Sequence, residues 1–178
     1  MKQRMASGLF LLIAAAILLF DFGPAPAVEA SPEARVPPET SLAIIVNQSN
    51  PVEKLSLEEL RRIFLGERSH WPHGHRITLV MMEPGQPERR AVLRQVCRMS
   101  EADFSRHFLH GLFTGEVFVS PKTLATPTGV RKFVFNVPGA IGYLRASDVD
   151  QSVRVLRIDE HLPDDKEYKL RVDQPPAK

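Results

Sequence analysis

The sequence predicts an α/β domain in which helices flank a mixed or parallel sheet. Apolar runs of strand length alternate along the chain with segments whose apolar residues recur at helical spacing. This alternation is typical of layered α/β domains, because each helix can cover the sheet formed by the strands around it. Residues 41–158 carry the pattern, and they are long enough to form one domain with its own core.

The residues before this domain have the composition of a secretory signal peptide. Within residues 1–30, a short basic stretch precedes an apolar run over residues 9–20, and a segment rich in proline and small residues follows. The run is shorter than the roughly 20 residues that a membrane-spanning helix needs. We expect cleavage after Ala30, with Ala27 as the alternative. The sequence thus predicts a periplasmic or secreted bacterial protein with no stable membrane insertion after cleavage.

The first ordered elements follow a leader. Residues 31–40 carry three prolines without apolar periodicity and are expected to be flexible. "SLAIIVN", residues 41–47, is an apolar run that predicts a strand. "LSLEELRRIFLG" predicts a helix, because its apolar residues share one face and Ser56 and Glu59 have the spacing of a capping box. The glycine that closes this segment is expected to end the helix.

The remaining elements continue the alternation as far as residue 158. In chain order we expect a strand over 75–82, a turn and helix over 83–99, a helix over 100–115, a helix from about Thr126 to before Pro138, and strands over 140–144 and 152–158. Residues 159–178 are polar. They are predicted to form a loosely held C-terminal tail.

Charge, cysteine content and motifs exclude several classes of protein. The formal net charge is +2, which favours neither nucleic acid nor a membrane surface as partner. Cys97 is the only cysteine, so no intramolecular disulfide can form, and its apolar helical context predicts a packed thiol. The sequence contains no nucleophile elbow, Walker loop or zinc-protease helix. We therefore predict no enzymatic activity and no cofactor.

Three histidines lie close together in "SHWPHGH", residues 69–75. His70, His73 and His75 are candidate ligands for a transition metal such as Zn²⁺, because neutral imidazole is a common metal ligand. The alternative is a structural turn between a helix and a strand. Pro72 fixes one corner and Gly74 can adopt a positive φ, with Trp71, just before Pro72, packed on the domain. The sequence favours the turn and leaves the metal site open.

Three segments carry a resemblance to a known family: "SLAIIVNQSNPVEKLSLEELRRIFLGERSHWPHGHRITLV", "HFLHGLFTG" and "VPGAIGYL". They resemble the phosphate-type periplasmic substrate-binding proteins of ABC transporters, and more closely their short, single-lobe relatives. The resemblance implies that residues 41–158 form a single lobe of a type II periplasmic-binding-protein fold. It also implies a small oxyanion such as phosphate as ligand, and an envelope protein or permease as partner.

The loop expected to hold the anion differs from the family's pattern. The phosphate binders place a Ser-Gly-Thr type of loop here, whereas this chain has "EPGQPERR", residues 83–90. Pro87 has no N–H to donate, and Glu88 adds a negative charge where the anion is expected. The candidate ligand-binding residues are Gly85, Gln86, Arg89 and Arg90. With the hydroxyls and the other lobe missing, we expect phosphate to bind weakly or not at all.

Three functions remain open at this point. The first is a secreted solute-binding module with weakened or lost oxyanion binding. The second is an accessory or interaction protein of the cell envelope that uses the lobe as a scaffold without transport. The third is a periplasmic metal-binding protein that uses the turn from His70 to His75. Fold alone does not decide among them.

Overall fold

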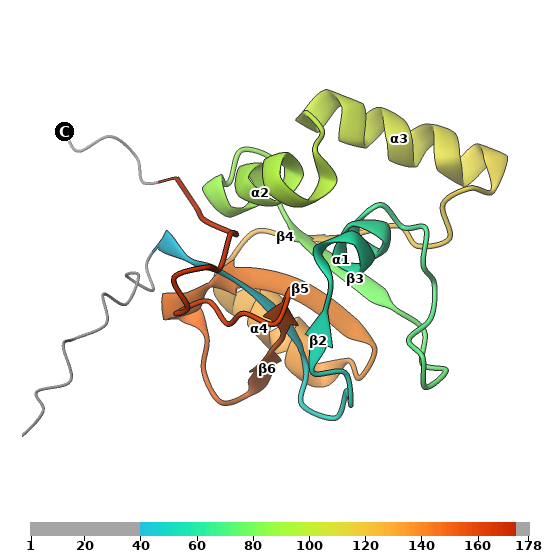
Figure 1. Ribbon diagram of the computed structural model, residues 1–178. Coiled ribbons are helices and arrows are strands. Elements are labelled where there is room, and N and C mark those ends of the chain that lie inside the picture. Colours follow the sequence, from blue (N-terminus) through green and yellow to red (C-terminus); the bar gives the residue numbers. More distant parts are fainter. Residues whose placement is uncertain (1–39, 174–178) are drawn as a thin grey trace, which may run out of the picture. The chain divides into compact units, whose positions relative to one another are not determined.

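The computed structural model describes residues 40–173, so the signal peptide and nearly all of the leader lie outside the described residues. A mixed sheet of five strands forms the centre, in the order β4-β3-β5-β1-β6 (Figure 1). Its strands are β1 (Leu42–Asn47), β3 (Thr78–Met82), β4 (Lys122–Leu124), β5 (Ala140–Arg145) and β6 (Val153–Val155). β3 pairs in parallel with β4 and β5, whereas β1 is antiparallel to β5 and β6. The prediction of an α/β domain with a mixed sheet is confirmed.

Helices cover both faces of this sheet. They are α1 (Leu57–Phe64), α2 (Pro87–Val92), α3 (Glu101–Thr114) and α4 (Pro127–Asn136). α4 lies on one face, and α1 and α2 lie over the other, with α3 outside them (Figure 1). A second, two-stranded parallel sheet joins β2 (Lys54–Leu55) to β7 (Arg157–Ile158). Among residues 40–173, no helix combines the length and apolarity that crossing a bilayer requires.

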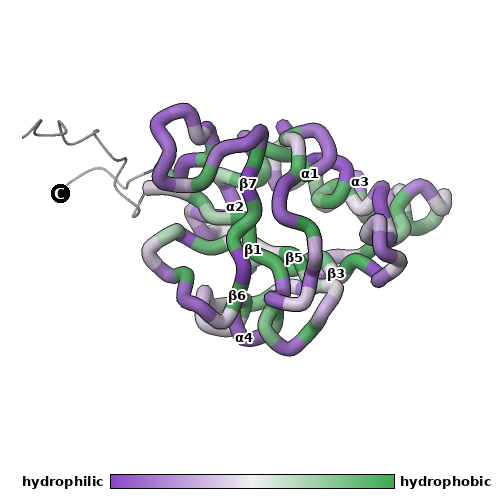
Figure 2. The backbone as a smooth tube through the Cα atoms, turned by 60° about the horizontal axis from the view of Figure 1, so that its bottom comes forward, coloured by the Kyte–Doolittle hydropathy of each residue, from purple (hydrophilic) through white to green (hydrophobic). Residues whose placement is uncertain are grey.

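The core lies between the sheet and its helices. Apolar strands β1, β3 and β5 run through the middle of the domain (Figure 2), and every residue of β1 is buried. Gly142 of β5 lets α4 approach closely, because a Cβ there would lie 3.1 Å from Val130 Cγ1. The hydroxyl of Tyr143 accepts a hydrogen bond from the backbone N–H of Met82 at 3.0 Å, which ties β5 to the end of β3.

Local sequence signals set the helix starts as expected. Ser56 and Glu59 form the predicted capping box at α1. Ser100 caps α3 and Thr126 caps α4 through their side chains. The second helix differs from its prediction, because α2 ends at Val92 and continues as a π-helical turn over Leu93–Cys97.

The prediction of a loose C-terminal tail is wrong for residues 159–173. Tyr168, Leu170 and Val172 are buried, and the backbone N–H of Leu42 donates to Leu170 O at 3.0 Å. The hydroxyl of Tyr168 donates to Leu42 O at 2.6 Å. Buried residues alternate with more exposed ones here, as on a strand with one buried face. The alternation is short and follows many charged residues, so apolar periodicity in the sequence does not identify it.

Candidate functional site

The candidate anion loop lies at the edge of the sheet where the parallel strands end. Met82 of β3 is in register with Leu124 of β4, and the backbone N–H of Glu83 donates to Leu124 O at 3.1 Å. The loops that lead into α2 and α4 are therefore neighbours. Open α/β sheets bind ligands outside the carboxyl ends of their strands, so we call this region the carboxyl edge and define it as residues 83–90 and 125–128.

Two of the predicted ligand residues lie at the surface of this edge. Gly85 is exposed with φ of 91°, and a Cβ built on it would meet no atom within 4 Å. Its positive φ explains why glycine occupies the turn before α2. Arg90 is also exposed, and its Nη1 donates to Gly85 O. Gln86 lies between them as the half-buried N-cap residue of α2.

Arg89 does not face the space over the loop, contrary to the prediction that it helps to hold an anion. Its side chain is buried and forms a bidentate ion pair with Glu101 of α3, with Nη2 at 2.6 Å from Oε1 and Nε at 2.9 Å from Oε2. Nη1 donates to Met82 O at 2.8 Å, and the guanidinium lies 5.4 Å from the centre of the Phe104 ring. These contacts occupy the guanidinium, so Arg89 joins β3, α2 and α3.

Glu88 does not place an uncompensated charge at the loop either. Its side chain is buried at the start of α2, and one carboxylate oxygen pairs with Nε of Arg145 at the end of β5. The pair neutralises a charge that burial makes costly. The sequence gives no local signal for this partner, because the two residues lie 57 positions apart.

The histidine segment forms the predicted turn. Gly74 has φ of 92° and its N–H donates to Trp71 O at 2.9 Å. Trp71 is buried, and its indole N–H donates to Gly139 O at 3.1 Å. The rings of His73 and His75 are 5.2 Å apart, and His70 Nδ1 lies 2.9 Å from Ser69 Oγ. Within residues 40–173, no three His, Cys, Asp or Glu side chains are arranged to hold a metal ion.

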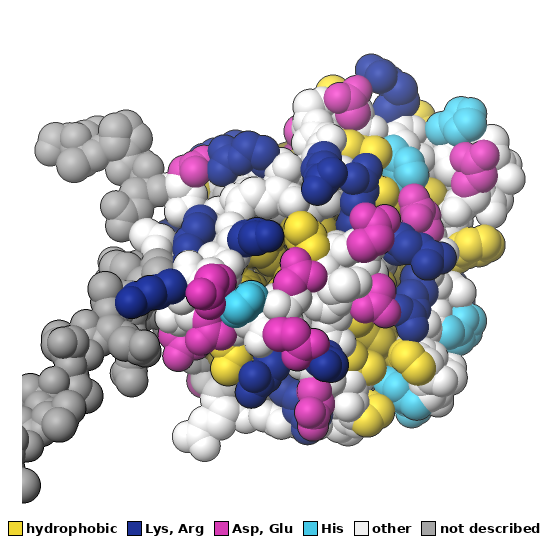
Figure 3. Space-filling view, viewed as in Figure 1, with side chains coloured by type: hydrophobic (Ala, Val, Ile, Leu, Met, Phe, Trp, Pro, Cys, Tyr) yellow, Lys and Arg dark blue, Asp and Glu magenta, His cyan; other side chains and the backbone are white. Residues whose placement is uncertain are grey.

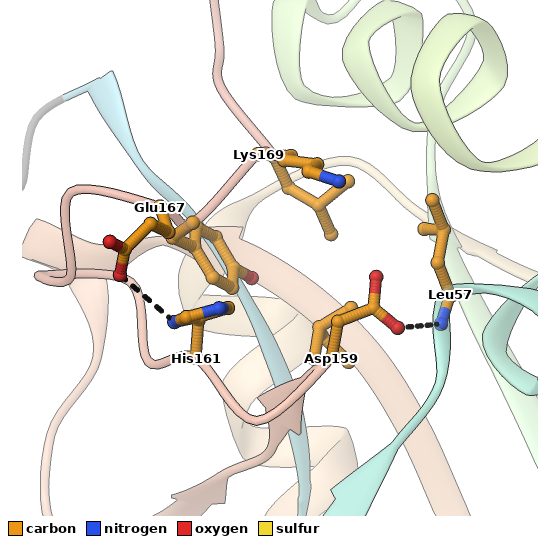
Figure 4. A pocket seen from close by; sticks show the side chains of 8 residues that line it. Leu57, Asp159, His161, Glu167 and Lys169 are labelled. Atoms are coloured by element: carbon orange, nitrogen blue, oxygen red, sulfur yellow. Dashed lines mark hydrogen bonds and ion pairs between the residues drawn. The ribbon is translucent and has the colours of Figure 1, made fainter.

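A pocket of about 250 Å³ lies between the C-terminal segment and the start of α1 (Figure 4). It is lined by Leu57, Ile158, Asp159, His161, Glu167, Tyr168, Lys169 and Leu170. Asp159 Oδ1 accepts the backbone N–H of Leu57 at 3.0 Å, and His161 Nδ1 lies 3.6 Å from Glu167 Oε2. Lys169 is the only lysine or arginine in this lining, beside these two carboxylates. The charge of the lining therefore does not favour an anion.

The rest of the visible surface shows no concentrated basic patch. Basic and acidic side chains are interspersed over the face in Figure 3. A field of one sign would attract a highly charged polymer, and this face lacks one. The mixture agrees with the small net charge.

No family model matches the chain, but solved structures do. A putative phosphate ABC transporter substrate-binding protein with bound phosphate from Clostridium perfringens matches with a TM-score of 0.61 and 23% identity, over 75% of this chain and 53% of that chain. The chain shares the fold of phosphate substrate-binding proteins. PstS from Borrelia burgdorferi matches with a TM-score of 0.57 and 13% identity, over 75% and 55% of the two chains.

The substrate-binding-protein fold recurs in an ABC-type phosphate transport receptor from Vibrio cholerae, with a TM-score of 0.54 and 21% identity, over 70% of this chain and 48% of that chain. The chain therefore spans about half the length of these proteins. The fold predicted from the three sequence segments is confirmed. The Vibrio cholerae protein is described as a transport receptor and the Clostridium perfringens protein as a substrate-binding protein.

Within this fold, the carboxyl edge has the chemistry of a modest anion site. It presents the guanidinium of Arg90, the amide of Gln86 and the start of α4. That helix has no acidic residue in its first turn, so its positive dipole end is not offset there. Thr126 and Thr128 are exposed at the same helix start. The exposed carboxylate of Glu83 belongs to the same edge, and its negative charge opposes the binding of an anion.

Proposed function

We propose that the chain is a solute-binding module that takes a small oxyanion such as phosphate at the carboxyl edge. The observation that carries this proposal is the placement of two helix starts side by side, where parallel β3 and β4 end. The proposal is supported by the shared fold, since one of the matched proteins has phosphate bound.

The ligand groups in this proposal are Gly85, Gln86 and Arg90. Arg89 is left out because Glu101 and the carbonyl of Met82 occupy it. One exposed guanidinium in the same loop as the exposed carboxylate of Glu83 gives little net attraction, and residues 83–90 contain no hydroxyl side chain. The exposed hydroxyls of the carboxyl edge are those of Thr126 and Thr128 at the start of α4. Charge-assisted hydrogen bonds are the strong ones in anion recognition. With one such donor we expect a dissociation constant of roughly 1 mM.

Isothermal titration with phosphate and sulfate tests the binding. The protein is purified from a host that expresses the full chain, and chloride at equal ionic strength serves as the reference. We expect phosphate to bind at about 1 mM and Arg90→Ala to weaken it at least about tenfold. The matched control is Arg62→Ala, because Arg62 is also an exposed helical arginine but lies on α1. No heat with phosphate at about 20 mM, or equal losses in both variants, would contradict the site.

The same proposal places the protein outside the cytoplasm, with an envelope protein or permease as its partner. Export depends on residues 1–30, whose composition is that of a signal peptide. Intact mass spectrometry of the fractionated host tests it. We expect the protein in the periplasm or medium, shortened by the segment up to Ala30 or Ala27. Full-length protein confined to the cytoplasm would contradict export, independently of the titration.

A further inference from the structure

Helix α3 has an apolar face that no other described element covers. It packs on the domain through Phe104, Phe108 and Gly111, which are buried. The opposite side of the helix faces away from the sheet and the other helices (Figure 1). We define its outer face by three exposed apolar side chains, Leu109, Leu112 and Phe113.

The exposure of these three side chains is large and contiguous. Phe113 is 85% exposed, Leu109 64% and Leu112 50%. Residues three and four positions apart are neighbours on a helix, so the three form one stripe rather than scattered contacts. Single exposed apolar residues are ordinary, whereas a contiguous apolar patch of a few hundred Å² is often a functional surface. The outer face of α3 is therefore a candidate surface for binding a partner.

Two exposed side chains of opposite charge flank the outer face, Arg106 on α3 and Glu116 just beyond its C-cap, Gly115. Arg106 lies one turn before Leu109, and its side chain is 77% exposed. Glu116 follows three positions after Phe113, and its side chain is 72% exposed. Within one molecule, both groups form ion pairs at the surface. Arg106 lies 3.2 Å from Asp103, and Glu116 lies 4.0 Å from His110. Such exposed pairs are weak, so both side chains remain able to pair with a second molecule.

This distribution of charge suits a second copy of the same chain. If two α3 helices pack antiparallel through their outer faces, with the two-fold axis at the height of residue 111 along the helix, Arg106 of each copy comes level with the partner's Glu116, which lies just beyond the C-cap of α3. The apolar stripes then lie against each other between two ion pairs. A parallel arrangement would bring Arg106 against Arg106 and Glu116 against Glu116, which is unfavourable. The face is thus complementary to itself in one orientation, as a two-fold interface requires.

We infer that the outer face of α3 is the interface of a weak two-fold dimer of this chain. The three side chains expose on the order of 350 Å² per copy, less than half of the roughly 800 Å² that a standard interface buries per partner. We therefore expect a dissociation constant on the order of 100 µM. The outer face of α3 shares no residue with the carboxyl edge, so the inference stands apart from the proposed function.

Sedimentation equilibrium tests the dimer over about 10 µM to about 1 mM. The sample is the form of the protein that is recovered after expression of the full chain. Mass spectrometry determines the mass of this form. We expect the average mass to rise with concentration toward twice the chain mass. Phe113→Glu should weaken association at least about tenfold, because it buries a charge in the apolar stripe. Phe135→Glu is the matched control, since Phe135 is 53% exposed on α4 and should leave association unchanged.

A charge exchange separates this arrangement from non-specific association. Arg106→Glu and Glu116→Arg should each weaken the dimer by at least about fivefold, because each places like charges opposite one another. The double variant restores opposite charges across the two-fold axis and should return association to within about threefold of the original. Circular dichroism confirms that each variant is folded.

Several results would overturn the inference. One is a chain that stays monomeric at about 1 mM, and another is equal loss of association in the Phe113 and Phe135 variants. Failure of the double charge exchange to restore association would exclude the antiparallel arrangement. Flotation of the monomer with anionic lipid vesicles, abolished by Phe113→Glu, would assign the outer face to a membrane surface instead.

Discussion

The Nη2 of Arg89 lies 2.6 Å from the Oε1 of Glu101, and this ion pair stands where the sequence predicted an anion ligand. Arg89 is 5% exposed, and the same guanidinium bonds the carbonyl that ends β3. The carboxylate of Glu101 thus takes the role expected of a bound anion. Glu101 of α3 supplies the counter-charge of Arg89, and for this reason we expect the carboxyl edge to bind oxyanions weakly.

Glu101→Gln should lower the free energy of unfolding by roughly 2–3 kcal/mol. This is below the cost of breaking a fully buried pair, because the Glu101 side chain is 38% exposed. Urea unfolding followed by the fluorescence of the single tryptophan gives the value. Glu160→Gln breaks the exposed pair with Lys54 and should cost less than about 1 kcal/mol. Equal costs for both variants would mean that Arg89 is not held as described.

Most of the fold was predictable because its signals are local. Capping residues and apolar spacing lie within a few positions of each other, so they mark α1, α3 and α4 directly. β4 was missed because it has three residues and none is buried. The candidate site was less predictable, since the side chains that neutralise its loop come from distant elements. Glu101 and Arg145 carry no feature in the sequence that assigns them to Arg89 and Glu88.

The histidine turn should depend on Trp71 and not on its imidazoles. Trp71→Phe removes the hydrogen bond to Gly139 O and part of a buried ring, so we expect a loss of roughly 1–3 kcal/mol. Replacing His70, His73 and His75 together by Ala should cost less than about 1 kcal/mol, because all three are exposed. Circular dichroism during urea unfolding measures both variants.

Metal content provides the second readout for this turn. We expect equal zinc and copper in the original protein and in the triple His variant, both purified without an affinity tag and measured by mass spectrometry of the metals. A stoichiometric metal that disappears only in the triple variant would contradict the structural interpretation of the turn.

The C-terminal segment should be necessary for stability. Tyr168→Phe keeps the buried ring and removes the hydrogen bond to Leu42 O, which should cost roughly 1–2 kcal/mol. The exposed neighbour variant Lys166→Ala should change stability by less than about 0.5 kcal/mol. Ending the chain at Asp159 should prevent cooperative unfolding, because β1 then loses the residues that cover its start. A truncated chain that unfolds like the original would restore the interpretation of a loose tail.

The thiol of Cys97 should be unreactive in the folded protein. Burial raises the pKa of Cys97 to about 12, so little thiolate exists at pH 8 and the sulfur is out of contact with solvent. We expect a disulfide reagent to label it at least about a hundredfold more slowly than in urea. Rapid labelling without denaturant would show that the π-helical turn opens readily.

The capping box at α1 should make stability depend on pH in the acid range. Hydrogen bonds from the backbone and side chain of Ser56 lower the pKa of Glu59, with help from Arg68 and Arg62. A carboxyl whose pKa is lower in the folded state stabilises the protein above its ordinary pKa, and this stabilisation is lost as the pH falls through the lowered value. The unfolding free energies of the original protein and Glu59→Gln should therefore differ at pH 6 and converge toward pH 3.

Ser56→Ala should cost roughly 1 kcal/mol at pH 6. In the same turn, Glu58→Gln should show a smaller change between the two pH values, because the exposed Glu58 is outside the capping box. A difference for Glu59→Gln that stays constant with pH would mean that the box does not act through the ionised carboxylate.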